Sequence, residues 1–183
     1  MKIVAFTGMP WSGKSEAVRL AKDQGIPVVR MGDMVWAETK HRGLELVDEN
    51  VGKVASEMRD KYGKDIWAQK TFKAIQQMDN KKLIVIDGVR NLEEVEYFQQ
   101  HLSTDFSLVA IDAHDETRYR RALQRQRIDD EHDITKLKER DKRELSWGLA
   151  EVIASADIVI TNENGLKPFQ QRILSLLHQL LKR

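Results

Sequence analysis

Gly8-Met9-Pro10-Trp11-Ser12-Gly13-Lys14-Ser15, close to the start of the chain, decides how the rest of the sequence is interpreted. These eight residues match G-x-x-x-x-G-K-[ST], the pattern of a loop that wraps around phosphate groups. An apolar run at residues 2–7 precedes them and is typical of a buried strand. Residues 16–23 follow with apolar positions at helical spacing. The motif therefore joins a strand to a helix, a context that favours a phosphate-binding loop over an ordinary glycine-rich turn.

Each fixed position of the pattern has a chemical purpose. Gly8 and Gly13 allow the backbone to curl around phosphate oxygens without a clash from a Cβ atom. Free N–H groups at the start of the following helix favour an anion. We expect Lys14 to reach the β- and γ-phosphates of a nucleoside triphosphate, and the Ser15 hydroxyl to hold Mg²⁺. Trp11 is unusual there, and it either shields or stacks on a ligand or has a local packing role.

Composition limits the class of protein. The chain has 183 residues, of which 32% are charged and 41% hydrophobic, as expected for one folded domain with a well-solvated surface. A net charge of +1 argues against a nucleic-acid-binding protein. The absence of cysteine excludes disulfides and thiolate chemistry, and the five histidines lack metal-ligand spacing. No apolar run approaches the roughly 18 residues of a membrane span, and no signal peptide is evident, so we expect a cytoplasmic protein.

Strand and helix patterns alternate along the chain. Further strands are expected at residues 28–31, 83–88, 106–112 and 158–160, which predicts an α/β fold with a parallel sheet. Residues 34–80 show helical patterns alone, and this block is too long for a plain crossover. We interpret it as a helical insert between the second and third strands. Residues 134–154 are expected to form one long helix, and residues 166–181 a closing amphipathic helix.

Two charged residues lie at the end of the third expected strand and just beyond it. Asp87 ends that apolar run, where a carboxylate would reach the edge of the sheet and help to hold Mg²⁺ beside Ser15. Because Asp-Gly is a common turn pair, Asp87 could instead simply end the strand. Arg90 could bind a second phosphate group through its guanidinium, or form a surface ion pair with Glu93 or Glu94.

Arginines are concentrated on the helix expected at residues 116–127. Arg118, Arg121 and Arg125 recur at three- and four-residue spacing and so share one face, and Arg120 and Arg127 lie beside them. Like charges at this spacing repel one another, and an anion such as a triphosphate would relieve that repulsion. We prefer this interpretation to a solvated face paired with Asp115, Glu116 and Asp129.

The helical insert offers few clear contacts for an acceptor. Asp33 opens it after Gly32, and could either contact an acceptor substrate or cap the next helix. Arg59 and Lys61 could reach an acceptor phosphate, but we interpret both as surface charges.

Together these motifs resemble the nucleoside-monophosphate-kinase branch of P-loop kinases over essentially the whole chain. The resemblance rests on the P-loop, Gly32-Asp33, Asp87-Gly88-Val89-Arg90 and the arginine cluster. It implies that Asp87, Arg90, Arg121 and Arg125 surround the donor and acceptor phosphates. It also implies a mobile lid at residues 127–141, with Arg127, Arg140 and Arg143 near the phosphates.

A closer resemblance is to archaeal proteins related to adenylate kinases and dephospho-CoA kinases. It is based on residues 140–148, Arg-Asp-Lys-Arg-Glu-Leu-Ser-Trp-Gly, and on the turn around Asn162 and Asn164 after the last strand. In dephospho-CoA kinases such a turn lies near the donor adenine, so the resemblance implies that Asn162 and Asn164 contact ATP. Where nucleotide kinases often have an arginine after Asp33, the nearest candidates here are Trp36, Lys40 and Arg42.

The resulting prediction is a single three-layer P-loop kinase domain. Its five-stranded parallel sheet has the order 2-3-1-4-5, with a helical acceptor-binding insert at 33–80 and a lid at 127–141. The expected activity is Mg²⁺-assisted transfer of a phosphoryl group from ATP to a small nucleotide-like acceptor. The alternatives are a dephospho-CoA kinase and an ATP-hydrolysing switch protein. Nothing in the sequence specifies an oligomeric state.

Overall fold

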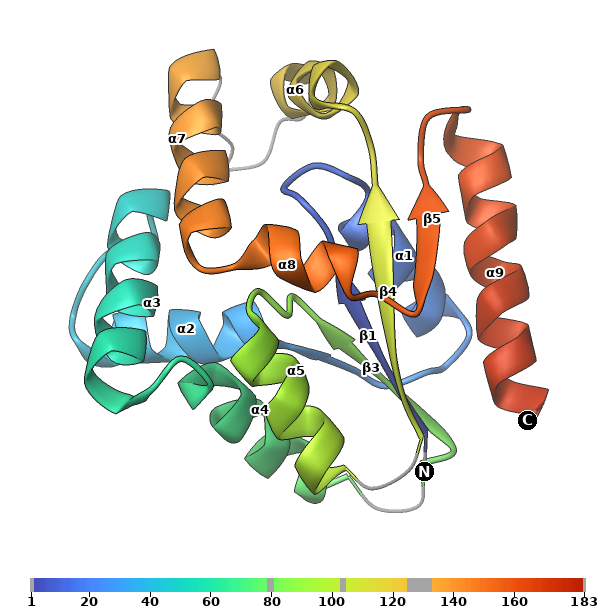
Figure 1. Ribbon diagram of the computed structural model, residues 1–183, viewed down its shortest axis with the longest axis horizontal. Coiled ribbons are helices and arrows are strands. Elements are labelled where there is room, and N and C mark those ends of the chain that lie inside the picture. Colours follow the sequence, from blue (N-terminus) through green and yellow to red (C-terminus); the bar gives the residue numbers. More distant parts are fainter. Residues whose placement is uncertain (1, 79–80, 103–104, 125–132, 183) are drawn as a thin grey trace.

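The computed structural model describes residues 2–78, 81–102, 105–124 and 133–182. Its five strands form one parallel sheet in the order β2-β3-β1-β4-β5, which confirms the predicted fold class and strand order (Figure 1). The strands are β1 (Lys2–Thr7), β2 (Val28–Arg30), β3 (Leu83–Asp87), β4 (Phe106–Asp112) and β5 (Ile158–Thr161). Parallel strands of this kind end at one edge, where α/β proteins bind ligands.

One face of the sheet is covered by two helices that lie far apart in sequence. Val4 and Phe6 of β1 point to this face and are fully buried. They pack with α1 (Lys14–Asp23) and with α9 (Leu166–Lys182), whose buried side chains include Phe169. The alternation of side chains along β1 sends its neighbours Ile3 and Ala5 to the opposite face. This explains why β1, in the centre of the sheet, is apolar at nearly every position.

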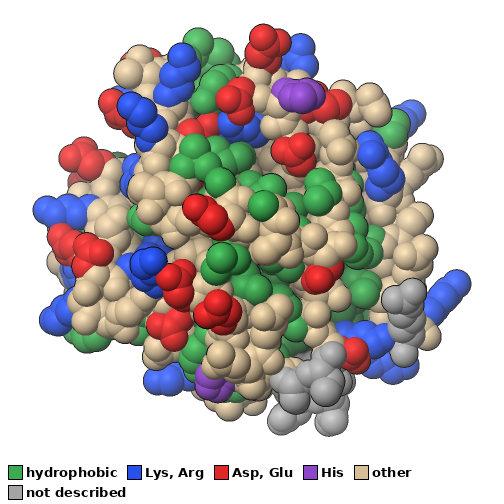
Figure 2. Space-filling model, viewed as in Figure 1, with side chains coloured by type: hydrophobic (Ala, Val, Ile, Leu, Met, Phe, Trp, Pro, Cys, Tyr) green, Lys and Arg blue, Asp and Glu red, His purple; other side chains and the backbone are tan. Residues whose placement is uncertain are grey.

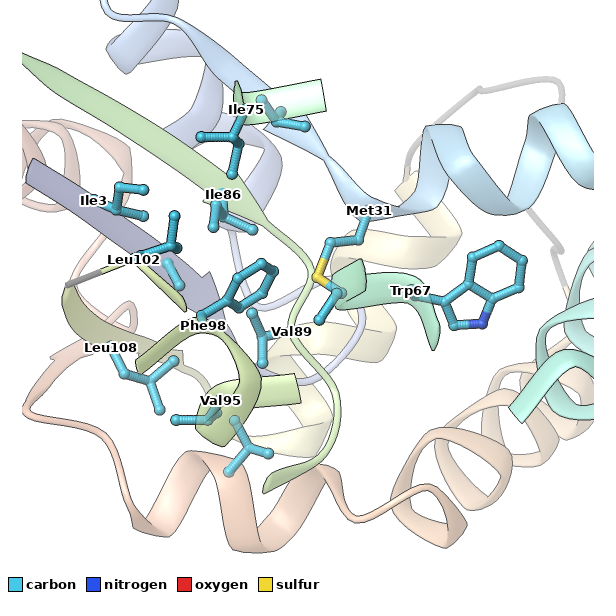
Figure 3. Close-up of a cluster of buried hydrophobic side chains, with 14 of the residues drawn as sticks. Ile3, Met31, Trp67, Ile75, Ile86, Val89, Val95, Phe98, Leu102 and Leu108 are labelled. Atoms are coloured by element: carbon cyan, nitrogen blue, oxygen red, sulfur yellow. The ribbon is translucent and has the colours of Figure 1, made fainter. Parts of the chain in front are cut away.

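The second face carries the larger layer of helices. These helices are α2 (Met31–His41), α3 (Asp48–Tyr62), α4 (Ile66–Gln76), α5 (Leu92–His101) and α8 (Leu149–Ala154). Figure 3 shows part of their shared core, in which Phe98 lies close to Ile86 of the sheet, while Trp67 belongs to the same cluster farther from the strands. The Trp67 indole N–H donates to the carbonyl of Ala55 at 3.3 Å, so this large ring is buried with its polar atom paired.

Two helices stand beyond the ends of the strands, α6 (Asp115–Gln124) and α7 (Ile134–Ser146) (Figure 1). The prediction of one continuous helix over residues 134–154 is wrong. The chain leaves helical geometry after Ser146, and Gly148 has a φ of 103°, in the left-handed region that favours glycine. The break lets α7 extend past the sheet while α8 packs on its face.

Acidic and basic side chains are interspersed on the face shown in Figure 2, with no large area of a single sign. This distribution agrees with the net charge of +1. Among the described residues, no helix is both long enough and apolar enough to span a bilayer.

Candidate functional site

A cavity of about 560 Å³ lies where β1 and β3 end. The P-loop and the start of α1 supply Trp11, Lys14 and Ser15 to its lining. The last residue of β3 supplies Asp87, and the segment after it supplies Arg90. Residues of α2, α3 and α7 also line it, among them Trp36, Val51, Arg140, Arg143 and Glu144. The expected phosphate-binding motif and the helical insert therefore face one common space.

The P-loop depends on its glycines at two positions where the backbone has positive φ. Gly8 has a φ of 137°, and a Cβ atom there would lie 2.2 Å from the carbonyl oxygen of Ile111. Gly13 has a φ of 120°, and its Cβ would lie 2.3 Å from Nδ2 of Asn162. Trp11 adopts a φ of 61°, which is uncommon for a bulky residue. The curled loop is thus incompatible with side chains at both glycines.

Lys14 is held by the loop to which it belongs. Its Nζ donates to the carbonyl oxygens of Gly8 and Met9, the latter at 2.9 Å. Burial lowers the pKa of Lys14 to about 8, although the negative charges of Glu144 and Asp87 oppose this change. A buried ammonium group binds a phosphate strongly, because the anion restores the charge stabilisation that burial removed.

Oxygen atoms suited to Mg²⁺ line the same cavity as this loop. The Ser15 hydroxyl and the Asp87 carboxylate both line the cavity, and Asp87 is the last residue of β3, paired in register with Phe6 of β1. Among the described residues, no group of three or more His, Asp or Glu could hold a metal ion by itself. This donor set fits Mg²⁺, which binds through one or two carboxylates together with phosphate oxygens and water.

Arg90 forms an ion pair, but with a different partner from those expected. Its Nε donates to Glu144 of α7 at 3.1 Å, while its backbone N–H donates to Glu94 at 2.7 Å. Glu144 is 3% exposed. Burial opposes its ionisation, but Arg90, Arg140 and Lys14 outweigh that effect and lower its pKa to about 2. A permanently charged carboxylate therefore lies among the cations of the cavity.

Helix α7 is tied to α3 by one carboxylate. Asp48, the first residue of α3, pairs with Arg143 at 2.6 Å and with Arg140 at 3.4 Å. The Arg140 guanidinium also lies 5.2 Å from the centroid of the Trp11 ring, so it joins the P-loop to this contact. Gly52 of α3 makes room for Arg143, since a Cβ there would lie 2.7 Å from its Nε.

The arginines of α6 have different environments. Arg121 lines the cavity and donates to the carbonyl oxygens of Ser12 and Asn162, at 3.4 and 2.7 Å. Arg118 is 1% exposed and pairs with Asp141 and Asp115, so its phosphate-binding interpretation is wrong. It braces α6 against α7 and donates to the carbonyl of Pro10 in the loop.

Asn162 lies against the P-loop, with its side-chain amide donating to the carbonyl of Ser12 at 2.8 Å. Asn164 is exposed and lies beside α9, outside the cavity lining. Asp33 does not cap α2, because that helix begins at Met31; it pairs instead with Arg30 at 3.4 Å. Arg125, Arg127 and the first part of the expected lid lie outside the described residues.

Arg59 contradicts its interpretation as a surface charge. It is 7% exposed, and its Nη2 donates to the fully buried Glu94 of α5 at 3.0 Å. Its guanidinium carbon lies 4.5 Å from the centroid of the Trp147 ring, and both residues line the cavity. Its partner is 35 positions away in the sequence, so no local pattern marks the pair. Lys61, in contrast, is exposed as expected.

The sequence of this chain is similar to those of known proteins. A family model described as an AAA domain matches residues 7–138. A UPF0200 protein of Methanosarcina barkeri is 44% identical over 182 residues, which cover 100% of this chain and 97% of that protein. A UPF0200/UPF0201 protein of Archaeoglobus fulgidus is 44% identical over 183 residues, but this chain spans 57% of its length.

A solved structure supports the fold assignment. The shikimate kinase of Bacteroides thetaiotaomicron superimposes on this chain with a TM-score of 0.60 at 14% sequence identity. The superposition covers 100% of this chain and 99% of the kinase chain. At that identity the likeness concerns the fold, and it confirms the predicted P-loop kinase fold. The chain belongs to the UPF0200 family, and its residues 7–138 match the AAA domain.

Proposed function

We propose that this protein transfers the γ-phosphoryl group of ATP to a small nucleotide-like acceptor. The observation that carries the proposal is that a phosphate-binding loop and a cation-rich wall of side chains share one cavity. A protein that bound the triphosphate alone would need the first of these but not the second. Closure of α7 over the cavity would exclude water, so that ATP is not hydrolysed without an acceptor.

The donor half of the cavity is built around the P-loop, residues 8–15. Its backbone N–H groups and Lys14 would bind the β- and γ-phosphates, with Arg121 and Asn162 supporting the loop from behind. Ser15 and Asp87 would hold Mg²⁺, which neutralises developing charge on the phosphates. We keep Asn164 as a proposed contact of the donor base, and Arg125 as a further proposed cation near the transferring group.

The acceptor half is built from α2, α3 and the residues after β3. Trp36, Val51 and Ala55 give it apolar and aromatic surface, and Arg90 gives it a cation close to Glu144. We propose that Arg90, Arg127 and Arg140 bind the acceptor, with Asp33 at the entrance. The chemistry of such a site is positioning and charge neutralisation rather than covalent catalysis.

The experiment is an acceptor panel monitored by ADP release. Purified protein with Mg²⁺ and ATP is incubated with AMP, CMP, dephospho-CoA, shikimate or no acceptor. We expect one class of acceptor to stimulate ADP release and to appear as a phosphorylated product by mass spectrometry. Product from dephospho-CoA alone selects that alternative. Hydrolysis that no acceptor stimulates points to a nucleotide-driven switch and contradicts the proposed transfer.

A further inference from the structure

Arg59 is a buried cation with only part of its hydrogen-bonding capacity used. Its Nη2 donates to Glu94, but its Nε and Nη1 have no partner among the residues that the structure describes. The side chain is 6% exposed and lines the cavity. Buried polar groups in folded proteins are almost always paired. Both nitrogens are buried, in a side chain that borders the cavity, and unpaired donors at such a position indicate a group that arrives with a ligand.

The guanidinium is held firmly in place. It lies over the ring of Trp147, with 4.5 Å between the guanidinium carbon and the ring centroid. The Trp147 indole N–H donates to the Ser56 hydroxyl of α3 at 3.1 Å, which fixes the ring. A cation held by a carboxylate and an aromatic ring loses little conformational freedom when a ligand binds.

Glu94 positions more than one group. Its second carboxylate oxygen accepts the backbone N–H of Arg90 at 2.7 Å, and its own N–H is capped by Asn91. One buried carboxylate thus sets Arg59 on α3 and the Arg90 segment after β3 relative to each other. Any anion bound by Arg59 would lie in a fixed relation to that segment.

The electrostatic balance at Arg59 favours a second anion. Burial lowers the pKa of Arg59, and the charge of Glu94 offsets this effect only partly. Neighbouring Arg90 adds positive charge, while it is itself paired with Glu144. A carboxylate or phosphate against the unpaired nitrogens would supply the missing charge and hydrogen bonds together.

We propose that Arg59, positioned by Glu94, binds an anionic group of the acceptor, either a carboxylate or a phosphate, on the α3 wall of the cavity. The inference rests on the proposed function, because it assumes that this part of the cavity receives an acceptor. It also selects among acceptors: a neutral compound would leave the Arg59 donors unmatched and would bind weakly.

The test is calorimetric titration in the presence of saturating AMP-PNP and Mg²⁺, which keep the P-loop filled. The probes are inorganic phosphate, AMP and CMP as phosphates, shikimate as a carboxylate, and adenosine as a neutral compound. The variant is the double substitution Arg59→Met and Glu94→Gln. It removes both charges together, while the amide introduced by the second change still offers an oxygen to the Arg90 N–H. Lys61→Met, which alters an exposed cation on the same helix, is the matched control.

We expect wild type and Lys61→Met to bind at least one anionic probe, and the double variant to bind it about 10- to 100-fold more weakly. Affinity for AMP-PNP and the thermal midpoint should stay unchanged, which a merely structural role for Arg59 would not allow. Whether shikimate or the phosphates respond identifies the anion. Equal binding by the double variant, binding of adenosine as tight as that of AMP, or no binding of any anion to wild type overturns the inference. If wild type did not bind AMP-PNP, that result would separately contradict the proposed donor site.

Discussion

The two halves of the cavity differ in construction, since one depends on backbone geometry and the other on pairs of side chains. The donor half is a backbone structure of eight consecutive residues, with two glycines and a lysine that folds back on the loop's own carbonyls. The acceptor half is made of side-chain pairs from separate elements of the fold. Arg59–Glu94, Arg90–Glu144 and Arg143–Asp48 join residues that are 35, 54 and 95 positions apart. The comparison teaches that the P-loop is specified by adjacent residues, whereas the opposite wall depends on contacts that folding alone brings together.

The strongest test of the donor half is Lys14→Ala. We expect at least a roughly 100-fold loss of phosphoryl transfer and of ATP hydrolysis, because a preorganised cation at the transferring group is removed. Stability should not fall, since the change removes a desolvated charge. Lys22→Ala, which alters an exposed lysine of the same helix, is the control for activity. Turnover within a few-fold of wild type would show that the loop does not hold the reacting phosphate.

In the acceptor half, the corresponding test is Glu144→Gln, and here the expected effect is on stability. The change leaves Arg90 and Arg140 without their buried counter-charge, and we expect a loss of about 3 kcal/mol of unfolding free energy at pH 7. Urea unfolding measures this, with Glu139→Gln at an exposed position as control.

The same variant carries a pH signature with a defined sign. The folded-state pKa of Glu144, about 2, lies below the usual value of about 4.3. Its stabilising contribution is therefore complete above pH 4.3 and is lost as the pH falls towards 2. The difference between wild type and Glu144→Gln should shrink over that range. A difference that stayed constant from pH 7 to pH 2 would contradict the ionised state of Glu144.

Much of the donor half could be predicted from the sequence, for physical reasons. A P-loop is read from adjacent residues, and the alternation of apolar runs with helical patterns indicated the parallel sheet. The acceptor half was harder to predict. Arg59 looks like any helical surface arginine, because its burial depends on Glu94 of another helix. The helix break at Gly148 was missed because residues on both sides of it favour helix, and tertiary packing decides where α7 ends.

The smallest expected effect again concerns the donor half. It is the pH dependence of ATP affinity, which depends on the pKa of Lys14. That pKa is about 8 in the protein alone, so above pH 8 Lys14 must take up a proton when a polyphosphate binds. ATP affinity should be nearly constant below pH 8 and fall by about tenfold per pH unit above it. Calorimetry in two buffers of different ionisation enthalpy detects the proton uptake at pH 9. Binding without uptake at that pH would place the phosphates away from Lys14.

Gly52 gives the acceptor half a property of its own. The Arg143 side chain of α7 occupies the space above this helical glycine of α3, where a Cβ atom would lie 2.7 Å from its Nε. A methyl group at this position would displace the Arg143 guanidinium and disturb its ion pair with Asp48. A single substitution at Gly52 would therefore alter the part of the cavity wall that Gly52 and Arg143 form, while the P-loop stays unchanged.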